Sequence, residues 1–400
     1  MSKARKYTAV DLFCGAGGLT LGFRLAGFKP LLAIDINHEA MLTYRRNNPD
    51  VIAIEEDIHK VDAERALDRI SNKFGDATVD VIVGGPPCEG FSIAGDRDPN
   101  DPRNRLFEEL IRFVKVMKPK IVVMENVKGL LSMKDPNGTL TVHRIIKSFN
   151  DIGYKVKYKV LNAADYGVPQ IRERVFFIAT RLDVPILFPE PTHAPINART
   201  LDVFLGKRVS NTLKPYVTVW EAIGDLPPLA PGEEKTVYEK EPFTDYQRWA
   251  RKGVPKDGLR NHKAVKHRKY MVERFKYIPP GKGLKDVWDR IPPHLKPKKL
   301  YGARCRRLDP NKPAFTVTAH CLDEMIHPYQ HRAITPREAA RLQSFPDWYV
   351  FEGPHVIFHS DPRQDQYEQI GDAVPPLLAK AVAEAVKTML DMVFKRGQAY

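Results

Sequence analysis

The N-terminal third of the chain alternates between short apolar runs and segments with helical spacing of apolar residues, and this alternation constrains the fold most strongly. The helical segments cover residues 19–25, 39–46 and 106–117. The apolar runs, each expected to form a strand, are Thr8–Phe13, Leu31–Ile34, Val51–Ile54, Val79–Val83 and Ile121–Met124. Strands linked by helical crossovers predict an α/β fold with a doubly wound, mostly parallel sheet.

Side chains suited to ligand binding or catalysis follow these runs. In a parallel sheet, the residues at the carboxyl ends of the strands line one crevice. Here they are the turn Gly15–Gly18, Asp35, Asp57, Cys88 and Glu125. Asp35 follows the glycine turn at about the spacing of a ribose-binding carboxylate, so the turn fits a dinucleotide, a nucleoside cofactor or no ligand. Its departure from GxGxxG, and a second acid, Asp57, that could bind an adenine amino group, favour a nucleoside cofactor.

Cys88 follows the run Val79–Val83 after two glycines and two prolines. These residues end a strand abruptly and direct the chain stiffly away from the sheet. The first nucleophile after that stop is the Cys88 thiol, which this placement would present to a ligand. A small buried cysteine beside a turn is the alternative interpretation.

The positive charge of the chain is concentrated in one segment. The formal net charge is +14, but residues 247–312 hold 21 Lys and Arg against 5 Asp and Glu. The rest of the chain is therefore slightly acidic. Aromatic residues lie among these cations, a composition that favours a nucleic acid over an anionic membrane or an acidic protein as the partner.

Composition also limits the compartment and the cofactors. No stretch approaches the length of a membrane span, and the N-terminus lacks the apolar core of a signal peptide. Four cysteines are too few and too scattered for a disulfide framework, so we expect a cytoplasmic protein. Cys305, His320, Cys321 and His327 lack the paired spacing of metal ligands, and we expect no metal.

A set of short motifs resembles the cytosine-C5 DNA methyltransferase family, in that family's order. The motifs are Asp11–Gly18, Gly85–Cys88, Gly95 with Asp101–Asn104, Glu125–Val127, Gln170–Arg174, Thr335–Gln343 and Gln369–Val374. The resemblance implies a class I, Rossmann-like methyltransferase fold with S-adenosyl-L-methionine as the cofactor. It also implies methylation of C5 of a cytosine that is flipped out of double-stranded DNA.

The resemblance assigns the catalytic residues. Cytosine C5 is a poor nucleophile, so a thiolate, here Cys88, would first add to C6. Glu125 would bind N3 and the exocyclic amine, and we expect a raised pKa for this carboxyl group in a dry pocket. Arg174 would hold the cytosine O2 with Arg172 beside it, and both cations would favour the thiolate.

The resemblance likewise assigns the cofactor site. The expected cofactor-binding residues are Phe13, Ala16, Gly17, Gly18, Leu19, Asp35, Ile36, Asp57, Ile58, Pro87, Asp372 and Val374. Asp372 departs from the family, which has asparagine there, and this leaves the direct amide contact in doubt. Glu89 replaces a common glutamine and is a milder departure.

We expect a discontinuous catalytic domain and a separate, smaller, irregular target-recognition domain. Residues 1–185 and 370–400 would form the first, 186–333 the second, and 334–369 a bracing segment with a helix capped by Thr335. A last helix, opened by Pro375 and Pro376, would pack its apolar stripe on the catalytic domain. Expected DNA contacts are Ser92, Arg97, Arg103, Arg304, Arg306 and Arg307, and whether the last three bind bases or phosphates stays open.

Two alternatives to a DNA methyltransferase are considered. A tRNA cytosine methyltransferase would use the same chemistry, but its usual Cys-Phe-Thr signature is missing from this sequence. A nucleic-acid-binding protein on an inactive scaffold would not need Cys88, Glu125 and Arg174. We therefore expect the modification enzyme of a restriction-modification system, with a cognate endonuclease as a possible partner, acting as a monomer on DNA.

Overall fold

The computed structural model describes residues 6–75, 78–87, 105–135, 138–196, 213–357 and 361–397. For residues 394–397 only the backbone is described. The chain forms two compact units. The sheet unit, as we name it, combines Met1–Asn162, Glu173–Glu190 and Pro376–Tyr400. The second unit comprises Ala163–Arg172 and Pro191–Pro375, so it includes the stretch 334–369 that was expected to be a separate bracing segment.

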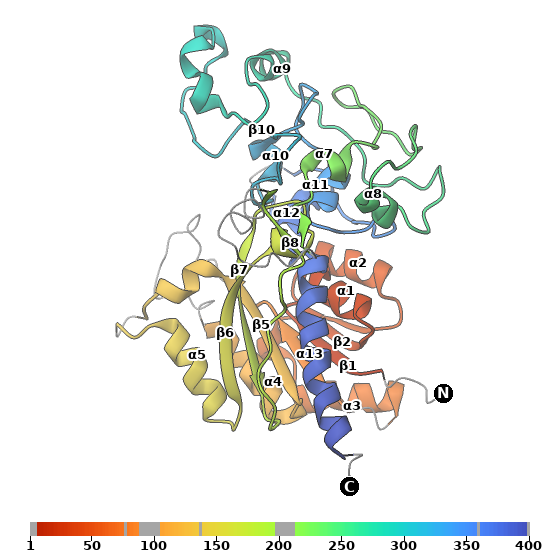
Figure 1. Cartoon of the computed structure of the whole chain (residues 1–400), viewed down its shortest axis with the longest axis vertical. Coiled ribbons are helices and arrows are strands. Elements are labelled where there is room, and N and C mark those ends of the chain that lie inside the picture. The colour runs from red at the N-terminus through yellow and green to blue at the C-terminus, as the bar shows by residue number, and fades with distance from the viewer. Residues whose placement is uncertain are drawn as a thin grey trace, which may run out of the picture. The chain divides into compact units, whose positions relative to one another are not determined.

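The sheet unit is built on one seven-stranded sheet in the order β3-β2-β1-β4-β5-β7-β6 (Figure 1). Its strands are β1 (Thr8–Leu12), β2 (Lys29–Asp35), β3 (Ile52–Glu55), β4 (Val81–Gly84), β5 (Ile121–Val127), β6 (Lys155–Asn162) and β7 (Glu173–Thr180). All pairs among β1 to β5 are parallel, and β7 runs antiparallel to both neighbours. The predicted doubly wound, mostly parallel sheet is confirmed.

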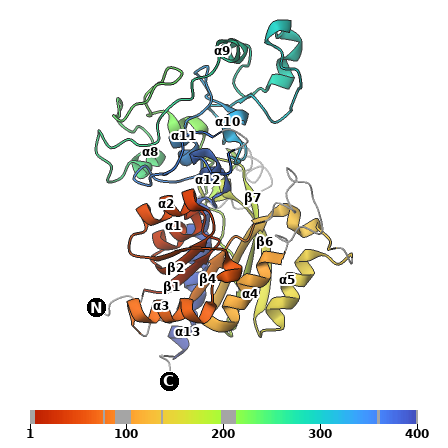
Figure 2. The ribbon, with the colours of Figure 1, turned by 180° about the vertical axis from the view of Figure 1, so that it is seen from behind.

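Helices cover both faces of this sheet. They are α1 (Gly18–Leu25), α2 (His38–Asn47), α3 (Ala63–Phe74), α4 (Leu106–Met117), α5 (Thr141–Asn150) and α13 (Pro376–Gly397). Helices α3, α4 and α5 bury their apolar faces with the strands in one core and lie in front of the sheet in Figure 2. Helix α13 crosses in front of the opposite face in Figure 1.

Helix α13 packs directly on α1. A Cβ atom on Gly22 would lie 2.3 Å from Cβ of Ala379, so only glycine permits this approach. The predicted apolar stripe of α13, Leu378, Val382, Val386 and Leu390, is buried, which confirms that the C-terminal helix packs onto the sheet unit.

The second unit consists of short elements joined by irregular segments, as its proline content suggested. Its helices are α7 (Val219–Ile223), α8 (Asp245–Ala250), α9 (Lys269–Lys276), α10 (Cys321–Glu324), α11 (Pro336–Leu342) and α12 (Gln366–Asp372). Two-stranded sheets pair β8 (His193–Ala194) with β9 (Lys214–Pro215) and β10 (Arg306–Arg307) with β11 (Met325–Ile326). None of the helices that the structure describes is long and apolar enough to cross a membrane.

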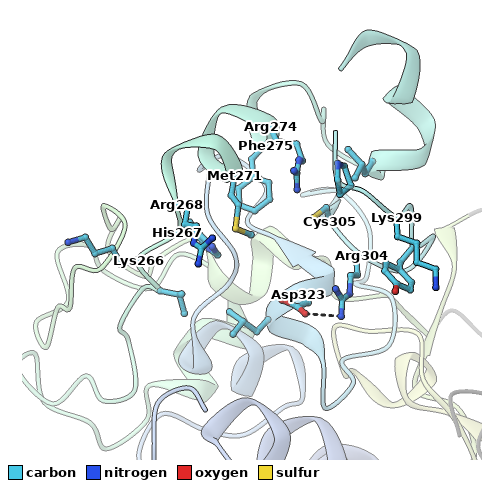
Figure 3. A pocket seen from close by; sticks show the side chains of 15 residues that line it. Lys266, His267, Arg268, Met271, Arg274, Phe275, Lys299, Arg304, Cys305 and Asp323 are labelled. Carbon is cyan, nitrogen blue, oxygen red and sulfur yellow. Dashed lines mark ion pairs between the residues drawn. The ribbon is translucent and has the colours of Figure 1, made fainter. Parts of the chain in front are cut away.

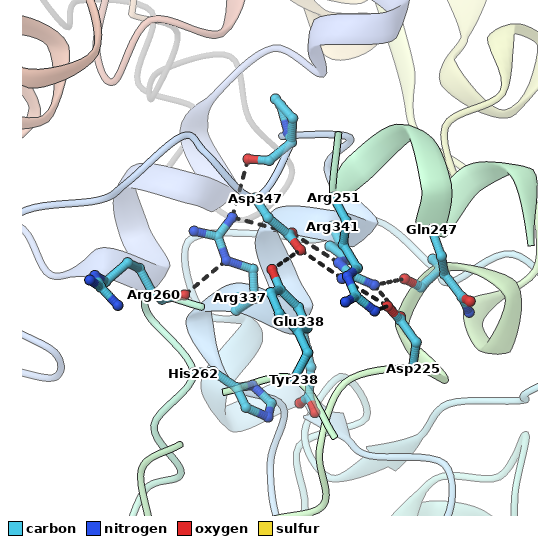
Figure 4. A network of polar contacts seen from close by, with 12 residues as sticks. Asp225, Tyr238, Gln247, Arg251, Arg260, His262, Arg337, Glu338, Arg341 and Asp347 are labelled. Carbon is cyan, nitrogen blue, oxygen red and sulfur yellow. Dashed lines mark hydrogen bonds and ion pairs between the residues drawn. The ribbon is translucent and has the colours of Figure 1, made fainter. Parts of the chain in front are cut away.

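A buried ionic network centred on α11 holds the second unit together. Arg337 and Arg341 flank Asp347, and Nη2 of Arg341 lies 2.7 Å from Oδ2 of Asp347 (Figure 4). Arg341 also pairs with Asp225, which lies more than a hundred residues away in sequence. As predicted, Thr335 caps α11, since its side chain accepts from the backbone N–H of Glu338. Such a network is costly to break, because any lost partner leaves a buried charge.

Candidate active site

The turn between β1 and α1 is shaped for close approach of a ligand to the backbone. Phe13, Gly15 and Gly17 all adopt positive φ angles, of 62°, 49° and 91°. Helix α1 then begins at Gly18, with Ala16 and Leu19 buried beneath the turn. Backbone with these φ angles leaves room beside the turn that a residue with an ordinary conformation would fill.

Asp35, at the end of β2, is tied to this turn. Its Oδ2 accepts a hydrogen bond of 2.7 Å from the backbone N–H of Gly15, and its Oδ1 accepts one of 2.9 Å from Asn37. Burial raises the pKa of Asp35, against the opposing effect of these hydrogen bonds. The next side chain, Ile36, is 69% exposed, which is unusual for isoleucine and leaves an apolar surface uncovered beside the carboxylate.

Asp57 and Ile58 follow β3 and differ in their surroundings. Asp57 accepts hydrogen bonds from the backbone N–H and the ring of His59, and these lower the pKa of Asp57. Ile58 begins a short 3-10 turn and is buried in the core beneath α3 to α5. Ile58 therefore supports the strand end from within, whereas Asp57 remains accessible at the surface.

Asp11 is the first residue of the motif Asp11–Gly18, but no role was predicted for it from the sequence. It is 2% exposed and accepts hydrogen bonds of 3.0 and 2.6 Å from the backbone N–H and the hydroxyl group of Thr20. Burial raises its pKa to about 7. The carboxylate thus joins β1 to α1. Its place as the one charged residue of β1, whose sequence is TAVDL, was the signal that could have identified it.

The chain leaves β4 through a closely packed pair of glycines. A Cβ atom on Gly84 would lie 2.7 Å from the carbonyl oxygen of Leu12, and one on Gly85 would lie 3.2 Å from Oε2 of Glu125. Asn126 donates a 3.1 Å hydrogen bond from its amide to the carbonyl of Pro86. The segment that leads to Cys88 is therefore fixed between β1 and β5. Pro87 is the last described residue of this segment, and Cys88, Ser92, Arg97 and Arg103 lie outside the described residues.

Glu125 and Arg174 form the ion pair of this site. Glu125 lies within β5, which continues to Val127 because its last residues pair with β7. Nε of Arg174, on β7, lies 3.1 Å from Oε1 of Glu125, with side-chain exposures of 16% and 11%. An arginine paired in this way fixes the orientation of the carboxylate. The two residues that were expected to bind the cytosine thus lie side by side.

Arg172 is a structural residue of the second unit, so the prediction that it is catalytic is wrong. It lies in the second unit, whereas Arg174 lies in the sheet unit. Its guanidinium group is buried and donates to the backbone carbonyls of Val317, Gly371 and Ala373. Arg172 therefore stabilises the backbone after α12 and does not present its charge to a substrate.

The comparisons with known proteins agree with this geometry. The family model for C-5 cytosine-specific DNA methylases matches residues 7–388. The chain belongs to this family. Type II methyltransferase M.DdeI from Desulfomicrobium norvegicum is 41% identical over 388 residues, which cover 94% of this chain and 88% of that protein. Type II methyltransferase M1.HphI from Haemophilus parahaemolyticus is 38% identical over 385 residues, which cover 96% of this chain and 87% of that protein.

A solved structure supports the same assignment. A prophage-encoded DNA modification methyltransferase from E. coli superposes with a TM-score of 0.71 at 27% identity, over 96% of this chain and all of that one. The chain is thus a DNA (cytosine-5-)-methyltransferase, an enzyme of a family that uses S-adenosyl-L-methionine. The predicted family, fold and enzyme class are confirmed.

The remaining expected cofactor contacts of this methyltransferase lie in the second unit. Asp372 ends α12 at the surface and accepts a 3.0 Å hydrogen bond from the amide of Gln364. Val374, two residues later, is buried. Among the described residues, no group of three His, Cys, Asp or Glu side chains could hold a metal ion.

Three of the arginines expected to contact DNA, Arg304, Arg306 and Arg307, lie among the described residues and differ sharply in their surroundings. Arg307 is 4% exposed and donates to the carbonyls of Phe275, Ile278, His327 and Gln330, so it is a structural residue and cannot bind DNA as predicted. In contrast, Arg304 is exposed and pairs with an aspartate side chain at 3.4 Å. Arg306 is partly exposed, and its guanidinium carbon lies 3.4 Å from the ring centroid of Phe315. The last two remain candidates.

Proposed function

We propose that this enzyme transfers a methyl group from S-adenosyl-L-methionine to C5 of a flipped-out cytosine within a specific double-stranded DNA sequence. The observation that carries the proposal is the Glu125–Arg174 pair beside the fixed segment that leads to Cys88. A carboxylate, a guanidinium and a thiol are the groups that this reaction needs, and in the sequence Cys88 directly follows Pro87, the last described residue of that segment.

The chemistry would proceed as follows on the substrate. The Cys88 thiolate adds to C6 of the cytosine, and the electron pair of the C5–C6 double bond becomes available at C5. Glu125 donates a proton to N3 as this charge develops, and Arg174 orients the carboxylate while it binds O2. C5 then takes the methyl group, with S-adenosyl-L-homocysteine as the leaving group. A base removes the C5 proton, the C6–S bond breaks to restore the thiolate, and N3 returns its proton to Glu125.

The residues at the ends of β2 and β3, together with the β1–α1 turn, fit the proposed cofactor. Bound S-adenosyl-L-methionine would supply an electrophilic methyl group. Asp35 would accept from the ribose hydroxyls, and the exposed face of Ile36 would pack on the adenine, whose amine Asp57 would bind. The remaining proposed contacts are those of Phe13, Ala16, Gly17, Gly18, Leu19 and Pro87. The exposed isoleucine beside a partly buried carboxylate supports this fit, because both gain from a ligand that is part apolar and part hydroxylated.

The biological setting is also part of the proposal. Relatives at 41% and 38% identity are named Type II methyltransferases, and such enzymes protect DNA from a cognate endonuclease. We infer that this chain modifies the site of such an endonuclease, as a monomer acting on DNA in the cytoplasm. Sequencing of chemically converted DNA from expressing cells would identify the modified cytosine.

Transfer of labelled methyl groups tests the proposal. Wild-type protein should label duplex DNA and leave tRNA unlabelled. Cys88→Ala should abolish transfer while S-adenosyl-L-methionine still binds, because the thiol acts on the cytosine and not on the cofactor. Normal turnover by Cys88→Ala, or labelling of tRNA instead of duplex DNA, would contradict the proposal.

A further inference from the structure

The second unit contains a pocket of about 480 Å³ that no step of the methyl transfer uses. Met271, Arg274 and Phe275 of helix α9 line one side of the pocket, and Lys299 and Arg304 lie on another (Figure 3). Its walls are largely apolar and include Met271, Phe275 and Leu284. This volume lies within the range of pockets that bind small organic groups.

The pocket is held in shape by its own small core and by backbone hydrogen bonds. Phe275, Leu284 and Cys305 belong to one buried apolar cluster beneath it. The backbone N–H of Cys305 donates to the carbonyl of Asp323, and the carbonyl of Cys305 accepts from Leu284. Three segments that are distant in sequence are thereby joined around the pocket, so a ligand would meet a largely preformed surface.

The rim of this pocket is cationic. Lys266, Arg268, Lys299 and Arg304 line it and are exposed, whereas Asp323 is the single acidic side chain among the described lining residues. The surrounding stretch 265–307 contains 14 Lys and Arg against 3 acidic residues. An apolar cavity under a rim of this charge suits a ligand that is itself part apolar and part anionic.

Tyr301 and the Arg304–Asp323 pair supply the specific contacts. Tyr301 is 48% exposed, with the cationic groups of Lys299 and Arg304 at 5.6 and 4.9 Å from its ring centroid. Arg304 and Asp323 point toward one another, 3.4 Å apart (Figure 3). The aromatic face can stack on a nucleobase, and the pair offers both donors and acceptors to a base edge.

We propose that this pocket holds one nucleotide of the target DNA, unstacked from its neighbours and distinct from the cytosine that is methylated. Its base would lie against Tyr301 and the apolar wall, and its phosphate would bind the cationic rim. A phosphodiester accounts for the rim and a base for the cavity, which neither a lipid surface nor an acidic peptide does. The proposal rests on the proposed function, since it assumes that double-stranded DNA is the substrate.

Matched substitutions of tyrosine and lysine test the pocket. The dissociation constant for a duplex that carries the methylated sequence should rise about 5- to 150-fold in Tyr301→Leu, the range for loss of one base–aromatic stack. Tyr270→Leu is the control, because Tyr270 has a similar exposure (43%) and lies on α9 outside the pocket lining. It should change the dissociation constant less than about 2-fold, since surface substitutions usually have small effects. Lys299→Ala should weaken binding and reduce its salt dependence more than Lys285→Ala, which lies outside the pocket lining.

Abasic substitution in the DNA locates the nucleotide. Each position of the recognised sequence is replaced in turn by an abasic nucleotide, and binding is measured for wild type and Tyr301→Leu. At one position, other than the target cytosine, the abasic nucleotide and Tyr301→Leu should together raise the dissociation constant by much less than the product of their separate fold-changes. Additive costs at every position, or equal effects of Tyr301→Leu and Tyr270→Leu, would overturn the pocket assignment. Binding of S-adenosyl-L-methionine and methyl transfer by wild type, measured in parallel, keep that failure distinct from a failure of the proposed function.

Discussion

Replacement of Arg174 by methionine tests the ion pair on which the proposed chemistry depends. The two side chains are 16% and 11% exposed and lie 3.1 Å apart, so the pair is largely removed from solvent. Breaking a buried pair costs roughly 3–5 kcal/mol, and the residual exposure places this one at about 3 kcal/mol. If that cost falls on the transition state, kcat/KM should drop by about 150-fold.

Labelled methyl transfer into a duplex substrate measures this loss directly. Lys128→Met is the matched control, because it removes an exposed ion pair of Lys128 with Glu173, with side-chain exposures of 58% and 48%. Exposed pairs contribute about 0–1 kcal/mol, so the control should retain activity within about 5-fold. Thermal unfolding and S-adenosyl-L-methionine binding separate a catalytic loss from misfolding. A folded Arg174→Met protein with activity within 3-fold of wild type would refute the reasoning.

Three further predictions concern stability and its pH dependence. Gly84→Ala places a Cβ atom 2.7 Å from a backbone carbonyl oxygen and should lower the free energy of unfolding by about 1–3 kcal/mol. Gly302→Ala is the control, because a Cβ atom there would have no neighbour within 4 Å, and it should leave stability unchanged. Equal unfolding midpoints of the two variants would contradict this prediction. Arg341→Met should lower the free energy of unfolding by about 3–5 kcal/mol, because it leaves buried carboxylates without their partner. Arg363→Met, which removes an exposed ion pair, should lower it by less than about 1 kcal/mol. Denaturant unfolding measures both values, and similar losses would contradict the network's role. The pKa of Asp11 is raised to about 7 in the folded protein, so as the pH rises the carboxyl group loses its proton in the unfolded state first. The stability of the wild type should therefore fall between about pH 4 and 7 relative to that of Asp11→Asn. Parallel pH profiles of the two proteins would contradict this prediction.

The sequence predicted strands β1 to β5, with ends within about three residues, because apolar periodicity is a local signal. It predicted neither β6 nor β7. Asp35 and Glu125 lie where the ends of β2 and β5 were expected, or close to them. The pattern placed the end of β5 at Met124, whereas the strand continues to Val127. Glu125 and Asn126 are polar and interrupt the apolar pattern that predicts a strand. They belong to β5 because they pair with β7, which lies about fifty residues further along the chain. That pairing is a tertiary effect that no local pattern contains.

Arginine roles could not be predicted from sequence, because they depend on burial. Arg172 and Arg174 are two residues apart, yet the first donates to carbonyls within the second unit and the second pairs with Glu125. Arg304 and Arg307 are similarly close, but one is exposed and the other is buried among backbone carbonyls. The guanidinium group serves DNA binding and backbone stabilisation equally well, so only its surroundings distinguish the two.

The most direct test of the account is a covalent adduct between Cys88 and the target cytosine. Fluorine in place of the C5 hydrogen removes the proton whose loss would release the thiolate, so the enzyme should remain bound through sulfur to C6. Mass spectrometry after reaction of the protein with S-adenosyl-L-methionine and a 5-fluorocytosine duplex should find the nucleotide on the peptide that contains Cys88, and Cys88→Ala should form no adduct. An adduct on another residue, or methylation of an ordinary duplex by Cys88→Ala, would contradict the central claim.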